Sequence, residues 1–176
     1  DDQQLVPSNL GAHDVVHALK FVNGNARAFG GDINQLTLFG HSYGGTLAAF
    51  IAHSPVTHKV VDIKRVVCMS PSVFATPPSH MYDVTLKFVT AAGCTSDDDS
   101  VALECLRSKN SSELIRIQRA IEDASMDKKA FEGIIYGAPL FPWTAPDEML
   151  QQPTKFELLA GSTIHELDWG TTSRNG

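Results

Sequence analysis

The chain has 176 residues, with 14 Lys and Arg against 20 Asp and Glu, so its formal net charge at neutral pH is −6. This acidic balance removes the electrostatic basis for binding a phosphate backbone, and we expect no nucleic-acid partner. The composition, 43% hydrophobic and 19% charged, is that of a globular protein and argues against disorder. No stretch reaches the about 18 consecutive apolar residues of a membrane span, and no targeting segment can be read at the N-terminus.

The first predicted element is a helix over residues 13–29. Its apolar residues recur three or four positions apart, which places them on one helical face: Val15, Ala18, Leu19, Val22, Ala26 and Phe29. Gly24 weakens the middle of this helix, and Gly30 with Gly31 ends it.

A strand, a helix and a second strand follow. Residues 35–39 are rich in β-branched and apolar types and lie between Asn34 and Gly40. Residues 44–52 have the pattern of a largely buried helix, and residues 64–69 predict another strand. This order predicts a βαβ unit, whose parallel strands are joined by a right-handed crossover.

The later elements repeat this alternation less regularly. Residues 82–92 and 111–124 have helical spacing, four prolines between positions 133 and 153 predict loops, and residues 156–161 are a third candidate strand. We therefore predict an α/β fold with a parallel βαβ core and helical excursions. No repeat or linker divides the chain, so it is expected to be one domain or a piece of one.

The residue pattern of greatest chemical interest is Gly40-His41-Ser42-Tyr43-Gly44, the only G-x-S-x-G in the chain. A predicted strand leads into it and a predicted helix leads out, which is the context of a serine nucleophile on a sharp, strained turn. We expect Gly40 and Gly44 to allow close backbone approach because they lack a Cβ, and the Tyr43 N–H to be an oxyanion donor. The alternative is a serine that only caps the following helix. A dinucleotide-binding loop is less favoured, since the glycines do not follow G-x-G-x-x-G.

Four segments, taken together, resemble the type-B carboxylesterases, the family that includes the cholinesterases. They are residues 8–14, residues 28–32 with Phe-Gly-Gly-Asp, residues 36–45 around the serine, and Ser54-Pro55. The resemblance implies a partial α/β-hydrolase fold, with residues 1–176 as the central fragment of a single α/β-hydrolase domain. It also implies a serine hydrolase of carboxylic esters that acts through an acyl-enzyme.

The resemblance further implies that Glu166 is the acid of the catalytic triad. Residues 158–166 are similar to the family segment in which a glutamate follows a strand ending in glycine. A carboxylate after a strand also lies at the sheet edge where open α/β folds bind ligands. Asp168 is a close competitor, and a solvated loop glutamate is the alternative without a catalytic role.

No histidine follows Glu166, although the expected chain order is Ser, then Asp or Glu, then His. His165 could be the base, but adjacent residues cannot easily fill two opposed roles in a triad. The resemblance implies that the histidine and a glycine-rich oxyanion segment lie outside these 176 residues. We expect the chain by itself to be inactive, because a serine without a base is a weak nucleophile.

The cysteines and one sequon bear on the cellular compartment. The resemblance implies a disulfide between Cys94 and Cys105, the alternative being two free thiols in a cytosolic protein. Asn110-Ser111-Ser112 is an N-glycosylation sequon, consistent with a secreted or ER-lumenal protein. Cys68, on a predicted strand, is expected to be buried. Asp97 to Asp99 suit the start of a short helix better than a metal site, and no metal or cofactor is expected.

His41 departs from the resembling family, which commonly has a glutamate before the serine. In cholinesterases that glutamate adds negative charge suited to a cationic substrate. We therefore hypothesise that the small-molecule substrate here is a neutral ester, a general carboxylic ester rather than a choline ester. Two alternatives remain: a non-catalytic cholinesterase-like adhesion protein, and a cytosolic lipase-like hydrolase.

Overall fold

The computed structural model describes residues 5–71, 75–125, 130–131, 133–137 and 139–166. These residues form two compact units. One contains residues 9–74 and 138–176 and is called the sheet unit below; the other contains residues 1–8 and 75–137 and is called the helical unit. In the described part of the chain, no helix has both the length and the apolar character needed to cross a bilayer.

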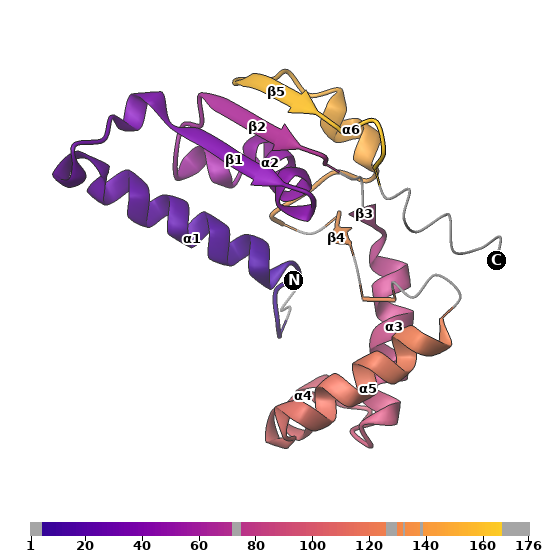
Figure 1. The fold of residues 1–176 in the computed structure, drawn as a ribbon. Coiled ribbons are helices and arrows are strands. Elements are labelled where there is room, and N and C mark those ends of the chain that lie inside the picture. The colour runs from indigo at the N-terminus through magenta and orange to yellow at the C-terminus, as the bar shows by residue number, and fades with distance from the viewer. Residues whose placement is uncertain (1–4, 72–74, 126–129, 132, 138, 167–176) are drawn as a thin grey trace. The chain divides into compact units, whose positions relative to one another are not determined.

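The sheet unit is built on three parallel strands in the order β1-β2-β5 (Figure 1). Its elements are α1 (Leu10–Asn25), β1 (Thr37–His41), α2 (Tyr43–His53), β2 (Arg65–Met69), α6 (Pro146–Leu150) and β5 (Glu157–Gly161), with short 3-10 helices at Ala26–Phe29, Ile33–Gln35 and Thr57–Lys59. The register places His41, Met69 and Gly161 side by side at the carboxyl ends of the strands. The predicted βαβ unit, third strand and α/β class are confirmed.

Helix α2 joins β1 to β2 and packs against both strands. Its inward side chains include Phe50 and Ile51, which are buried together with Val66 of β2. The Phe50 ring meets the rings of Phe141 and Trp143 edge-on, at centroid distances of 5.4 and 6.1 Å. Burial of each such large side chain stabilises the fold by about 2 kcal/mol, so this core holds the turn between β1 and α2 in place.

Helix α1 differs from its prediction in the face that it buries. Its buried residues are Ala12, Val16 and Leu19, whereas the predicted face included Val22 and Phe29, which are 38% and 83% exposed. The α-helix ends at Asn25, and a tighter 3-10 turn follows over Ala26–Phe29. The change to a 3-10 turn after Asn25 breaks the period of 3.6 residues, so Phe29 does not continue the face predicted for the helix.

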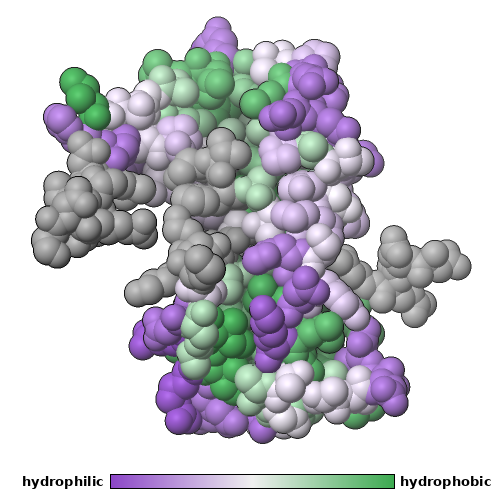
Figure 2. All heavy atoms as spheres, turned by 90° about the vertical axis from the view of Figure 1, so that its right-hand side faces the viewer, coloured by the Kyte–Doolittle hydropathy of each residue, from purple (hydrophilic) through white to green (hydrophobic). Residues whose placement is uncertain are grey.

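The described residues of the helical unit form three helices and one pair of short strands: β3 (Ala75–Thr76), α3 (Pro78–Ala91), α4 (Asp99–Ser108), α5 (Ser111–Ala124) and β4 (Ile134–Ile135), with β3 parallel to β4. An apolar groove of about 500 Å³ lies between α3 and α5, lined by Val84, Ile117 and Ile121 among others. Figure 2 shows apolar residues in green among hydrophilic residues in purple on the surface. None of the residues predicted for catalysis lines the groove.

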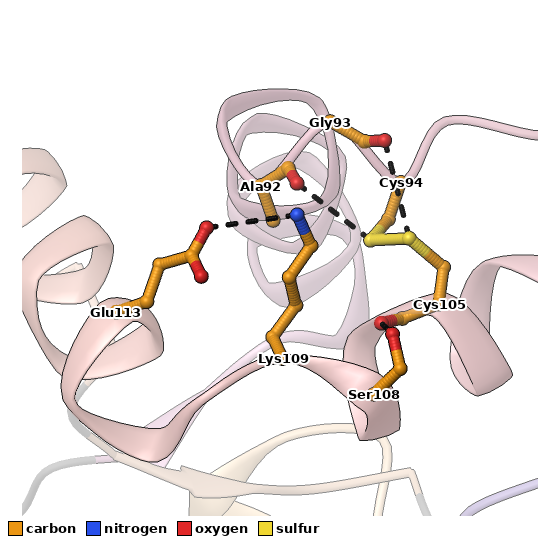
Figure 3. The surroundings of a disulfide bond; sticks show 7 residues. All are labelled: Ala92, Gly93, Cys94, Cys105, Ser108, Lys109 and Glu113. Atoms are coloured by element: carbon orange, nitrogen blue, oxygen red, sulfur yellow. Dashed lines mark hydrogen bonds and ion pairs between the residues drawn. A yellow bond between two sulfur atoms is a disulfide. The ribbon is translucent and has the colours of Figure 1, made fainter.

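The predicted disulfide between Cys94 and Cys105 is present (Figure 3). It joins the segment after α3 to α4, and Gly93 precedes Cys94 with a φ of 68°, a conformation that favours glycine. In the chain-entropy model a loop of this length stabilises the fold by about 3 kcal/mol. Cys68 is buried and 3% exposed, as predicted.

Candidate active site

Ser42 occupies the turn between β1 and α2 in a strained backbone conformation. Its φ and ψ are 54° and −128°, a region that a residue with a Cβ rarely adopts and that costs about 1–3 kcal/mol. The Ser42 N–H donates to the Met69 carbonyl at 2.8 Å, and the Ser42 carbonyl accepts from the N–H groups of Gly45 and Thr46 at 2.9 and 3.2 Å. These bonds from β2 and α2 fix the turn on both sides.

The side chain of Ser42 is exposed and makes no hydrogen bond to the start of α2. The alternative interpretation, in which the serine only caps the helix, is therefore wrong. The predicted sharp turn is confirmed, and it presents the hydroxyl to the surface at the carboxyl edge of the sheet. That presentation is what attack on an external ester requires.

Of the two glycines expected to allow close backbone approach around Ser42, Gly40 does so and Gly44 does not. A Cβ on Gly40 would lie 2.1 Å from the Gly44 carbonyl oxygen, so only glycine fits there. A Cβ on Gly45 would lie 3.1 Å from the Gly40 oxygen and 3.3 Å from that of Met69, while a Cβ on Gly44 would meet nothing within 4 Å. The close approach thus depends on Gly40 and Gly45, and the expectation for Gly44 is wrong.

Tyr43 is the first residue of α2 and directly follows Ser42. Backbone N–H groups in the first turn of a helix lie at the positive end of its dipole. The Tyr43 N–H therefore belongs to the part of the helix where an anion next to Ser42 is stabilised. Its predicted role as oxyanion donor rests on this position.

Glu166 lies in the turn after β5 and is held by two hydrogen bonds. The Ser70 hydroxyl donates to its carboxylate, and the Thr163 N–H donates to Oε1 at 2.6 Å. These bonds, with a smaller electrostatic contribution from the His41 imidazole, hold the pKa of Glu166 below its usual range. These interactions therefore favour the ionised form of this exposed carboxylate.

Ser70 is the site residue that the sequence analysis missed. It follows β2 directly, has a φ of 47°, and its N–H donates to the Gly161 carbonyl at 2.7 Å. Met69 binds the Ser42 N–H and the next residue binds Glu166, so the end of β2 anchors both the serine and the carboxylate. A signal was available, because a polar residue directly after a parallel strand lies at the ligand-binding edge.

The structure says less about the remaining candidate residues, His165, Asp168 and His41. His165 lies in the same turn as Glu166, and Asp168 lies outside the described residues. His41 ends β1 beside Ser42 and is exposed. Within the described residues, no group of three or more His, Cys, Asp or Glu could hold a metal ion.

Two of the residues predicted for catalysis, Ser42 and Glu166, lie at the carboxyl edge of the sheet. An exposed serine on a strained turn follows β1, and a hydrogen-bonded carboxylate follows β5, the two strands that flank β2 in the parallel sheet. A serine of this kind attacks a carbonyl once a base takes its proton, and a carboxylate orients that base.

Comparisons with known proteins identify a matching family and several relatives. The model of the carboxylesterase family matches residues 1–175. The chain is 30% identical over 169 residues to carboxylesterase 3 of Pongo abelii and to carboxylesterase 3 of Homo sapiens, covering 93% of this chain and 28% of each relative. It is also 30% identical over 169 residues to acetylcholinesterase of Myxine glutinosa, covering 92% of this chain and 48% of that protein. The chain thus spans less than a third of the first two relatives.

Proposed function

Since this chain belongs to the carboxylesterase family, we propose that it carries the nucleophile and the acid of a serine esterase that hydrolyses carboxylic esters. The observation that carries the proposal is the conformation of Ser42, which combines a positive φ, an exposed hydroxyl and a position between a strand and a helix. Strain of this kind persists only where the surrounding structure holds it, and it is concentrated at functional sites.

In the proposed mechanism the Ser42 Oγ attacks the ester carbonyl carbon while a histidine takes the hydroxyl proton. The carbonyl oxygen becomes an oxyanion, stabilised by the Tyr43 N–H at the start of α2. The carbon–oxygen bond to the alcohol then breaks, and the histidine returns the proton to the leaving alcohol. Water repeats the sequence on the acyl-enzyme, releasing the carboxylic acid and free Ser42.

Glu166 is proposed to hold the histidine ring in the productive tautomer and to stabilise its protonated form. This role needs an ionised carboxylate that is held in place, and the bonds from Ser70 and Thr163 support the proposal. We propose that the catalytic histidine is none of the seven histidines in this sequence. The chain matches only 28% of its carboxylesterase 3 relative, which leaves room for this histidine elsewhere in a full-length protein.

A neutral ester is the proposed substrate class, rather than a cationic choline ester. His41 is exposed beside the nucleophile and supplies no negative charge there. A full-length protein that cleaves short acyl nitrophenyl esters faster than choline esters is the expected result. The reverse preference would contradict the proposed class while leaving the esterase activity intact.

A secreted or ER-lumenal location is proposed from the Cys94–Cys105 disulfide. Disulfides of this kind persist in oxidising compartments and are rare in the cytosol. Non-reducing peptide mapping of the protein from its native source should recover the two cysteines in one linked peptide pair. Recovery as free thiols would favour the lipase-like cytosolic alternative.

The experiment that tests the esterase proposal is pre-steady-state hydrolysis of a nitrophenyl ester by the full-length protein. We expect a burst of nitrophenol equal to the enzyme concentration, lost in Ser42→Ala and slowed by on the order of 10⁴-fold in Glu166→Gln, as expected when the orienting carboxylate is lost. Ser111→Ala, an exposed serine in the helical unit, is the matched control and should keep the burst. A burst that survives Ser42→Ala would mean another nucleophile, and no hydrolysis in the wild type would favour a non-catalytic protein.

A further inference from the structure

Asn110 is the N-cap of α5 and also the acceptor of the only Asn-x-Ser/Thr sequence in the chain. Its backbone is extended, and its Oδ1 accepts the Ser112 N–H at 2.8 Å. Because a backbone N–H can only donate, the amide oxygen must be the atom turned toward the helix. The capping bond therefore leaves the amide nitrogen, Nδ2, on the other side of the planar group.

The surroundings of Asn110 leave room for a large attached group. Asn110, Ser111 and Ser112 are exposed, and no residue of α5 is buried. The adjacent Lys109 and Glu113 form an ion pair at 3.6 Å on the surface (Figure 3). A sugar at this helix start would thus displace no packed side chain.

The helical unit also contains a disulfide close in sequence to the sequon, and disulfides form in oxidising compartments. Cys105, five residues before Asn110, is disulfide-bonded to Cys94. Structural disulfides form in the secretory lumen, where asparagine in this sequon is also modified.

We propose that Asn110 carries an N-linked glycan and caps α5 at the same time, with Nδ2 bonded to the sugar and Oδ1 to the helix. In the transfer, the Nδ2–C1 bond forms and the C1–oxygen bond to a lipid-linked diphosphate oligosaccharide breaks. The diphosphate leaves with the electron pair, and Nδ2 loses one proton. The product is still an amide, so its oxygen keeps the acceptor that the Ser112 N–H needs.

Helix α4 shows that the cap alone does not need the amide nitrogen. Asp98 caps α4 with the same geometry, its Oδ1 accepting the Ser100 N–H at 2.8 Å. A carboxylate is as good an N-cap as an amide and suits the helix dipole better. The nitrogen of Asn110 is therefore the group that glycosylation uses and that capping leaves unused.

To test this proposal, the full-length protein is expressed in eukaryotic cells and treated with peptide N-glycosidase in heavy-oxygen water, which labels each aspartate formed from a glycosylated asparagine. We expect a faster-migrating band and a labelled aspartate at position 110, retained in Ser112→Thr and absent in Ser112→Ala and Asn110→Asp. Arg27→Thr, which creates a second sequon at the partly exposed Asn25, serves as the control for entry into the lumen.

Thermal unfolding separates the cap from the sugar. The Ser112→Ala and Asn110→Asp variants keep the cap but carry no sugar, and glycosylated wild type should unfold at a temperature no lower than theirs. Asn110→Ala, which lacks the cap, should unfold at a lower temperature. A wild-type chain without sugar would overturn the proposal, whether or not Arg27→Thr gains one. A glycosylated wild type that unfolds as early as Asn110→Ala would show that the sugar breaks the cap.

Discussion

A methyl group added at Gly40 should disrupt the turn that presents Ser42. The Cβ of Gly40→Ala would lie 2.1 Å from the Gly44 oxygen, 2.4 Å from the Gly44 carbonyl carbon and 2.6 Å from the Gly45 nitrogen, all backbone atoms. The end of β1 and the start of α2 must then separate by about 1 Å, because packed backbone has no free space to absorb the methyl. We expect a loss of about 3 kcal/mol of folding free energy, at the upper end for overpacking. A displacement of about 1 Å at a nucleophile lowers kcat/KM by on the order of 100-fold.

Gly44→Ala is the matched control, since it adds the same methyl to the same motif. Its Cβ would meet nothing within 4 Å, and the residue lies in α2, where alanine is favoured over glycine by about 1 kcal/mol. Urea unfolding and nitrophenyl ester hydrolysis, measured on the full-length protein, compare the two variants. Equal stability and equal activity of Gly40→Ala and Gly44→Ala would refute the described geometry of the turn.

Three further predictions concern the acid, the disulfide and a partly buried histidine. Ser70→Ala removes the hydroxyl that donates to Glu166, so the pKa of Glu166 should rise toward its ordinary 4.5 in carbon-13 NMR of the carboxyl group; an unchanged pKa would exclude the bond. Replacing Cys94 and Cys105 by serine should lower the free energy of unfolding by about 3 kcal/mol, and equal urea midpoints would contradict this. Burial lowers the pKa of His58 below its ordinary 6.5, so the unfolded chain binds the proton more readily and stability should fall as the pH drops through 6.5. His58→Gln should flatten that slope, and an identical slope in both proteins would contradict the assignment.

The parallel sheet and the helix after Ser42 were predictable because local pattern and tertiary environment agree there. Residues 35–39 and 64–69 are rich in apolar and β-branched types, and both form strands whose ends differ from the predicted ones by at most two residues. The G-x-S-x-G motif predicted the strained turn because few other structures place a serine between a strand and a helix.

The parts that were missed depend on contacts between segments far apart in the sequence. Gly44 and Gly45 are alike in sequence, and only the path of β1 and β2 past the helix start decides which one needs to lack a Cβ. Ser70 gains its role from Glu166, 96 positions later in the chain. The buried face of α1, with Ala12, Val16 and Leu19, likewise depends on packing against α2, which the spacing of apolar residues along the sequence does not reveal.

The central claim is that the Ser42 hydroxyl is an activated nucleophile, and covalent labelling tests it most directly. The full-length protein, incubated with an organophosphate and digested, should yield one phosphorylated peptide with the adduct on Ser42. The modified fraction should match the loss of ester hydrolysis. A hydrolytically active protein labelled at another residue, or left unlabelled at Ser42, would contradict the account.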